Sequence, residues 1–197
     1  WIIGLLLFNA YPLLMSAYYS LTSYSILEQE QWVGLENYRM LMQDPIFWTS
    51  IYNTLYYTMF FVPLSIVVGV GLALLLNMKI RFQGIFRTVF FVPSLVPAIA
   101  TTIIWMWLLN PQFGLVNQWL EQIGIPGPPW LGSEHWSKPS LILMSLWGIG
   151  QAVVIYLAGL GDIPQDYYDA SDVDGANWWR KTVHITLPLL TPVIFFN

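Results

Sequence analysis

Four long apolar runs of the chain contain no Asp, Glu, Lys or Arg. They cover about residues 1–27, 54–76, 89–109 and 140–160, and a fifth apolar run starts near residue 188. A helix needs about 20 apolar residues to cross the hydrocarbon of a bilayer, and charged side chains there are costly. The pattern therefore predicts an all-α, polytopic transmembrane helix bundle, with four complete spans and the start of a fifth. Residues 1–197 are expected to form a single transmembrane domain.

The composition agrees with a membrane environment. Hydrophobic residues make up 56% of the chain and charged residues only 9%, whereas a soluble domain has about 25% charged residues. The basic residues form no stripe that could bind nucleic acid. The chain has no cysteine, so disulfides, thiolate nucleophiles and cysteine metal ligands are excluded. Trp1 opens directly into an apolar run, and the fifth run is shorter than a span. We therefore expect a fragment, truncated at both ends.

Positive charges predict the orientation of the bundle. Two connections, one between the second and third spans and one before the fifth, hold Lys79, Arg81, Arg87, Arg180 and Lys181. The loops 28–53 and 110–139 carry one such charge each. Since Lys and Arg concentrate on the cytoplasmic side, both connections are predicted to be cytoplasmic. In the opposite loops we expect a short helix within residues 33–44 and an amphipathic helical turn after Phe113, with Trp119, Trp130 and Trp136 near the membrane interface.

An acidic stretch, "DIPQDYYDASDVDGANWWRKTVHITLPLL", covers residues 162–190. Asp162 and Gln165 have the spacing of a capping box and predict a helix over about 163–174. Gly175 can end that helix, because glycine enters the left-handed conformation freely. Asn177 can cap a second helix that ends before Pro188. The prediction is a helix, a glycine break and a second helix, within a cytoplasmic loop over 161–187.

Three explanations compete for this acidic stretch. An EF-hand loop with Gly175 at its sixth position would place Ala170 first and Lys181 twelfth, which excludes calcium because the bidentate Glu is missing. A solvated acidic loop is the second explanation. The third is a helix that docks on a partner protein, with Asp162, Asp166, Asp169 and Asp172 on one face and small residues nearby. The residues alone leave the second and third explanations open.

The segment resembles the "EAA" loop of the membrane-spanning subunits of ABC importers. The matching residues are Asp169-Ala170-Ser171, Asp174-Gly175-Ala176 and Ile185-Thr186-Leu187-Pro188, with Asp in place of the first Glu and Ser in place of the second Ala. Stretches such as "VGLENYRMLMQDPIFW", "NTLYYT" and "ITLPLLTP" are similar, in order, to the carbohydrate-uptake branch, which includes maltose and glycerol-3-phosphate permeases. "GLENY" is more similar to the first permease subunit of such systems.

The resemblance implies a binding-protein-dependent ABC importer of the type I permease fold in the bacterial inner membrane. The short helix would dock on an ATPase through Asp169, Ala170, Ser171, Asp172, Asp174, Gly175 and Ala176. The implied partners are a second permease subunit, two ATP-binding subunits that hold ATP and Mg²⁺, and an extracellular solute-binding protein. The implied function is alternating-access import of a sugar or related solute. The chain lacks G-x-x-x-x-G-K-[ST], so we expect it not to be an enzyme. An ion-coupled secondary transporter and a membrane scaffold are the alternatives.

The residues that meet the solute are weakly indicated. Gln151 is the one amide in the middle of a span, and polar groups inside membranes are often functional. A hydrogen bond from Gln151 to a neighbouring helix explains it equally well. Tyr156, Thr101 and Thr102 are weaker candidates for the solute path. No metal site is predicted.

Overall fold

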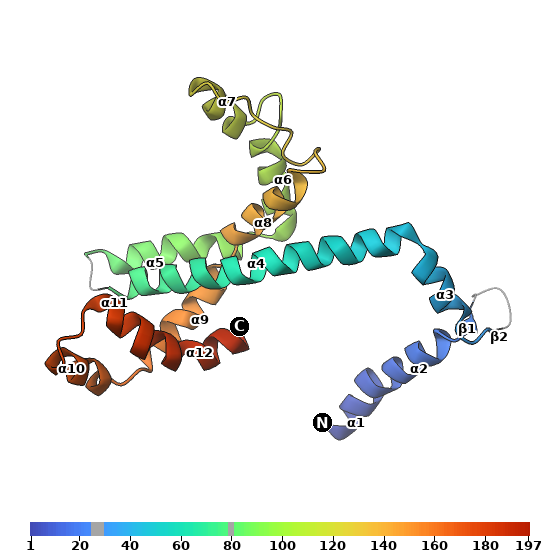
Figure 1. Cartoon of the computed structure of the whole chain (residues 1–197), viewed down its shortest axis with the longest axis horizontal. Helices are drawn as coiled ribbons and strands as arrows, with labels where there is room; N and C mark the ends of the chain where they lie inside the picture. Colours follow the sequence, from blue (N-terminus) through green and yellow to red (C-terminus); the bar gives the residue numbers. More distant parts are fainter. Residues whose placement is uncertain (25–29, 79–80) are drawn as a thin grey trace. The chain divides into compact units, whose positions relative to one another are not determined.

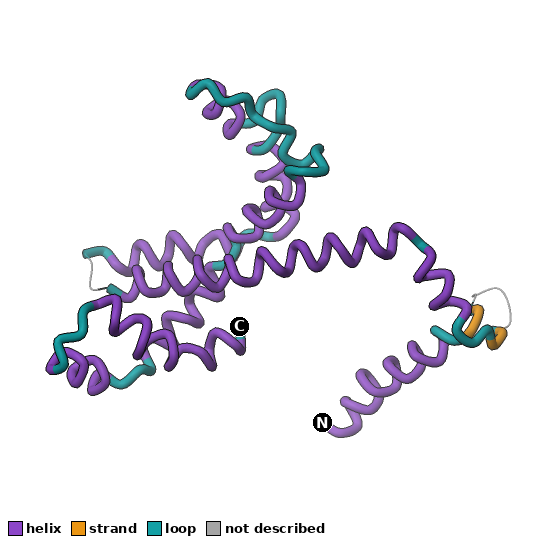
Figure 2. Tube along the Cα trace, in the orientation of Figure 1, coloured by secondary structure: helices purple, strands orange, loops and turns teal. Residues whose placement is uncertain are grey.

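The computed structural model describes residues 1–24, 30–78 and 81–197, and nearly all of its regular structure is helical (Figures 1 and 2). The chain divides into two compact units, Trp1–Leu55 and Tyr56–Asn197. The end of the predicted span 1–27 and the predicted cytoplasmic charge Lys79 lie outside the described residues.

The first unit is built on one apolar helix and a small polar junction. The helix is formed by α1 (Ile2–Leu5), a π-turn η1 (Leu6–Ala10) and α2 (Tyr11–Tyr19). A two-residue antiparallel pair follows, β1 (Thr22–Ser23) with β2 (Gln31–Trp32), and then α3 (Glu36–Gln43). The helix predicted within residues 33–44 is therefore confirmed.

The junction is held by side chains of α3 that reach back to the end of α2. The amide of Asn37 donates to the backbone carbonyls of Ser20 and Thr22, at 2.9 Å each. The hydroxyls of Ser20 and Tyr38 are 2.7 Å apart. The two bonds from Asn37 satisfy carbonyls that lack helical partners beyond the last turn of α2.

The helix α4 (Pro45–Asn77) begins in the first unit and continues into the second. The other elements of the second unit are α5 (Gln83–Phe91), η2 (Val92–Leu95), α6 (Ala98–Leu108), α7 (Leu115–Gln122), α8 (Ser137–Trp147), α9 (Gly150–Gly161), α10 (Gln165–Val173), α11 (Trp178–Lys181), the π-turn η3 (Thr182–Thr186) and α12 (Leu187–Phe196). The helical turn predicted after Phe113 is α7.

The third and fourth predicted spans are bent. Gln83–Leu95 and Ala98–Leu108 meet at 98°, and Ser137–Trp147 and Gly150–Gly161 meet at 51°. The first break follows from Pro97, because a residue before proline is disfavoured in the helical region, and Val96 is extended. Among the described residues, Ile2–Tyr19 and Pro45–Asn77 are long and apolar enough to cross a membrane, or four segments are if each bent pair counts as one span.

The core of the second unit lies where α4, α9 and α12 meet. Its buried side chains are Val70, Ala73, Leu76, Val153, Tyr156, Leu160 and Leu190. Glycines allow this close contact: a Cβ on Gly69 would lie 2.9 Å from Tyr156 Cε2, and one on Gly159 would lie 2.9 Å from Leu190 Cδ1. A Cβ on Gly150 would lie 2.5 Å from the carbonyl oxygen of Phe90.

In the loop that joins α6 to α8, tryptophans serve internal contacts. The indole nitrogen of Trp130 donates to the Oδ1 of the buried Asn117 at 2.6 Å. The rings of Trp130 and Trp136 meet edge to face, 5.2 Å apart. Trp119 is exposed on α7, so of the three tryptophans predicted near the membrane interface it is the one with most of its surface free.

Both π-turns end two residues before a proline, at Pro12 and Pro188. Proline lacks an N–H and crowds the carbonyl four residues earlier, and the wider turn absorbs that conflict. The N–H of Leu187 bonds to the carbonyl of Thr182, five residues back. The helix therefore continues from Trp178 to Phe196, and the prediction that it ends before Pro188 is wrong.

Candidate functional site

The acidic stretch and the helix that follows it form a helical hairpin after α9 (Figure 1, orange to red). The shorter arm is α10, and the longer arm is the continuous helix that starts at Trp178. The loop 174–177 joins the two arms.

The predicted capping box is absent. Asp162 ends α9, Pro164 takes the N-cap position of α10 with an extended backbone, and no side chain caps the helix. The cause is Pro164, which disfavours a helical conformation at Ile163 and separates Asp162 from the next helix. The side chain of Gln165 donates instead to Asp169 at 3.1 Å, one helical turn on.

The predicted glycine break is confirmed. Gly175 has φ of 69°, in the left-handed region that favours glycine. The N–H of Gly175 donates to the carbonyl of Asp172 at 3.1 Å, and the N–H of Ala176 donates to the carbonyl of Ser171 at 2.9 Å. This pair of bonds is a Schellman motif. The predicted cap at Asn177 is also confirmed, because its Oδ1 accepts the N–H of Arg180 at 2.9 Å.

The acidic face of α10 is smaller than expected. Asp162 lies outside the helix, which leaves Asp166, Asp169 and Asp172. All three are exposed, but the carboxylate of Asp172 forms an ion pair with the amino group of Lys181. That pairing joins residues nine apart and gave no signal in the sequence.

The seven predicted docking residues divide by exposure. Asp169, Ala170, Asp172, Asp174 and Gly175 are exposed and Ala176 is half-buried. Ser171 is buried, and its hydroxyl donates to the carbonyl of Tyr168 at 2.7 Å. The Ser171 side chain therefore faces the inside of the hairpin and not its surface.

An apolar tip lies among the carboxylates. Val173 is 88% exposed between Asp172 and Asp174, and Tyr167, Trp178 and Trp179 are also exposed. Exposed apolar groups on a polar surface are typical of interaction sites. The sequence signal for Val173 is a branched apolar residue with an aspartate on each side.

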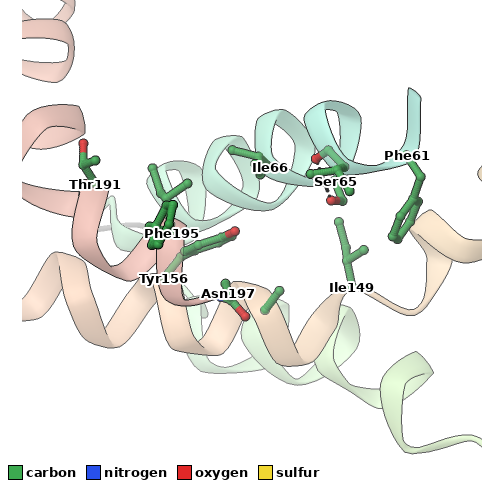
Figure 3. Close-up of a pocket in the computed structure, with 11 residues that line it drawn as sticks. Phe61, Ser65, Ile66, Ile149, Tyr156, Thr191, Phe195 and Asn197 are labelled. Atoms are coloured by element: carbon green, nitrogen blue, oxygen red, sulfur yellow. Dashed lines mark hydrogen bonds between the residues drawn. The ribbon is translucent and has the colours of Figure 1, made fainter. Parts of the chain in front are cut away.

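The four candidate solute-path residues do not come together. Tyr156 is buried and lines a cavity of about 480 Å³ together with Ser65, Thr191 and Asn197 (Figure 3). Gln151 is exposed on α9 and does not line that cavity. Thr101 and Thr102 lie on α6, where the Thr102 hydroxyl donates to the carbonyl of Ala98 at 2.8 Å. No group of three His, Cys, Asp or Glu residues that could hold a metal ion occurs in the described part of the chain.

The family model described as "Binding-protein-dependent transport system inner membrane component" matches residues 65–197. The chain is 37% identical over 199 residues to the probable ABC transporter permease protein YesP of Bacillus subtilis (strain 168), with 100% of this chain and 64% of that protein covered. It is 35% identical to the sulfoquinovosyl glycerol transport system permease protein SmoG of Agrobacterium fabrum (strain C58 / ATCC 33970), with 93% and 61% covered.

The fold is also similar to a solved structure. A bacterial ABC transporter involved in the import of the acidic polysaccharide alginate matches with a TM-score of 0.82 and 26% identity, over 98% of this chain and 66% of that one. The chain thus spans less than two thirds of the length of these relatives, including 64% of YesP.

Proposed function

Because the chain belongs to the family of binding-protein-dependent transport system inner membrane components, we propose that it acts as a transmembrane permease subunit of an ATP-binding-cassette importer. Import would proceed by alternating access and would be driven by a separate ATPase that binds ATP and Mg²⁺. The further partners we propose are a second permease subunit, a second copy of the ATPase and an extracellular solute-binding protein.

The proposed solute is a sugar or a related compound. Three proteins that are similar to this chain over most of its length are named for transport of sulfoquinovosyl glycerol, arabinooligosaccharides and lactose. The cavity beside Tyr156 supports this class, because aromatic and aliphatic walls with a few polar groups suit a sugar. The polar groups there are Ser65, Thr191 and Asn197. Tyr156 is the member of the predicted solute path that this cavity favours, and Gln151, Thr101 and Thr102 remain weaker proposals.

We assign ATPase docking to one part of the hairpin, namely α10 and the loop 174–177. The observation that carries this assignment is an exposed helix that ends in a Schellman motif and displays Val173 between two carboxylates. Exposed ion pairs contribute only about 0–1 kcal/mol each, so packing of the apolar tip would supply most of the affinity. Asp169 and Asp174 would then set register and partner choice.

Coupling also requires the hairpin to bind the two states of the ATPase with different affinity. A partner that binds both states of a protein equally does not shift the equilibrium between them. The small residues Ala170 and Gly175 are exposed beside the apolar tip and would allow the ATPase surface to approach the backbone closely. The buried Ser171 would not touch the ATPase and would support the docking helix from inside the hairpin, through its bond to the carbonyl of Tyr168.

A single cysteine at Ala170 tests this assignment, because the chain has no cysteine of its own. Ala170 is exposed whereas Ser171 is buried, so Ala170 is the better reporter. In the full-length protein we expect maleimide labelling from the cytoplasmic side and a crosslink to a cysteine on the co-expressed ATPase, with a yield that ATP changes.

The matched control is a cysteine at the exposed Glu121 of α7, which the charge distribution predicts to lie on the opposite side of the membrane. It should label from outside and give no crosslink. Labelling of Ala170→Cys from outside would overturn the orientation. Labelling from inside without any crosslink would favour a membrane scaffold over an importer subunit.

A further inference from the structure

The two arms of the hairpin are joined by side chains at two points. The hydroxyls of Tyr168 and Thr186 are 3.0 Å apart, and Asp172 pairs with Lys181. Tyr168 and Asp172 are four residues apart on α10, so they lie on the same helix face. Between them the buried Ser171 allows the arms to approach closely.

The π-turn explains how the longer arm meets both points. Lys181 and Thr186 are five residues apart and would point about 140° away from each other on a regular α-helix at 100° per residue. In a π-turn residues five apart are hydrogen-bonded, which brings them to one side. Here the hydroxyl of Thr186 donates to the carbonyl of Lys181 at 3.3 Å, and both side chains face α10.

The ion pair stands where each charge alone is unfavourable. Asp172 lies in the last turn of α10, and Lys181 lies in the first turn of the helix that continues to Phe196. A helix dipole disfavours an anion at the C-terminus and a cation at the N-terminus. The Lys181 side chain is nevertheless largely buried: it is 19% exposed, against 64% for the side chain of Asp172. The contact across the hairpin compensates for both placements.

A small cavity lies behind this contact. Its volume is about 220 Å³, and it is lined by Leu74 and Asn77 at the end of α4, by Leu160 of α9, and by Tyr168, Lys181 and Thr186 of the hairpin. The cavity leaves a gap between the hairpin and the end of α4, although Leu190 of the longer arm shares the buried core with Val70 and Ala73 of α4. Two side-chain contacts within the hairpin join its arms directly.

We propose that Tyr168, Asp172, Lys181 and Thr186 form a clamp that makes α10 and the helix from Trp178 to Phe196 move as one body. They are positioning residues: they carry a displacement of α10 into the helix that contains α12. The carboxylate of Asp172 serves this contact and not the ATPase surface. The mechanical role of the clamp rests on the proposed function, because α10 is taken as the docking helix. The rigidity of the hairpin does not depend on it.

Amide hydrogen exchange of residues 165–173 in the purified full-length protein tests the rigidity. Lys181→Met should raise the exchange rate about twofold to fivefold, the range that an exposed ion pair supports. The double reversal Asp172→Lys with Lys181→Asp should restore the slow rate, since each reversed charge suits its helix end. Arg180→Met is the matched control, as Arg180 is exposed and forms no ion pair with a described residue, and it should leave the rate unchanged.

The mechanical role is tested in the complete transporter with its ATPase. A cysteine at Ser65, in the cavity beside Tyr156, reports through maleimide labelling how far ATP changes access to that cavity. We divide the ATP-dependent change in labelling by the amount of ATP hydrolysed. In Lys181→Met this ratio should fall by about twofold to fivefold. The double reversal should restore it.

The proposal is overturned if Lys181→Met leaves the exchange rate of α10 unchanged. It is equally overturned if the double reversal restores slow exchange but not the labelling response, because Asp172 would then act on the ATPase directly. A parent transporter without any ATP-dependent change in labelling would refute the proposed function instead. The exchange measurements would still decide whether the clamp exists.

Discussion

Substitution of Gly175 separates the conformation of the hairpin from its contact with a partner. Gly175 has φ of 69°, and a Cβ built on it meets no atom within 4 Å. An added side chain therefore causes no clash, and the cost is conformational. A non-glycine residue in the left-handed region costs about 1–2 kcal/mol. That energy corresponds to about a fivefold to thirtyfold shift in the equilibrium of the helix end.

Three variants of this one residue make the test. Gly175→Ala loses the favoured conformation but adds little volume. Gly175→Asn adds volume but tolerates the left-handed region. Gly175→Arg adds charge and volume and also strains the backbone. We expect amide exchange over residues 170–176 to rise about fivefold to thirtyfold in Ala and Arg and to stay within about twofold of the parent protein in Asn.

Co-purification of the ATPase is the second measurement in this series. Gly175→Arg should lose it and Gly175→Asn should weaken it, because both place atoms on the exposed surface beside Ala170. Normal co-purification with the Arg variant would count against docking at this surface. An exchange rate in Gly175→Ala equal to that of the parent protein would refute the conformational reasoning, since the strain would then be absent.

Two further substitutions test the packing and the outer loop. Gly150→Ala should destabilise the protein by about 1–3 kcal/mol, because its Cβ would lie 2.5 Å from the carbonyl oxygen of Phe90. Gly71→Ala is the control, with nothing within 4 Å, and an equal melting temperature for the two variants in detergent would contradict the packing. Asn117→Ala should cost about 1–3 kcal/mol by leaving the buried amide partners, including the indole N–H of Trp130, unbonded. Faster proteolysis within 110–136 would report that loss, and unchanged cleavage would refute it.

Local backbone chemistry made several features predictable from the sequence. The glycine break at Gly175 and the cap at Asn177 depend on one residue and its immediate neighbours, and the structure confirms both. The uncharged apolar runs predicted an all-α membrane bundle and the resemblance implied the permease fold, and the family match and the similar solved fold confirm both. The docking and solute-path residues stay predictions.

Both wrong predictions concern the backbone next to a proline. The expected capping box at Asp162 placed Pro164 in the first helical turn, whereas Pro164 takes the N-cap position and the helix starts at Gln165. The expected end before Pro188 did not allow for a π-turn, in which one wider turn carries the helix past a proline. In both places a proline and its neighbours had more than one possible backbone conformation.

The sequence by itself determined which segments are apolar, where the hairpin turns and which family the chain resembles, because these depend on residue type and short spacing. Only the tertiary structure decided that Ser171 faces inward, that Asp172 is bound by Lys181 and that Val173 stands exposed. These facts depend on how two helix arms are rotated against each other. That rotation is set by a π-turn and by contacts between residues 9 to 18 positions apart, which no local pattern encodes.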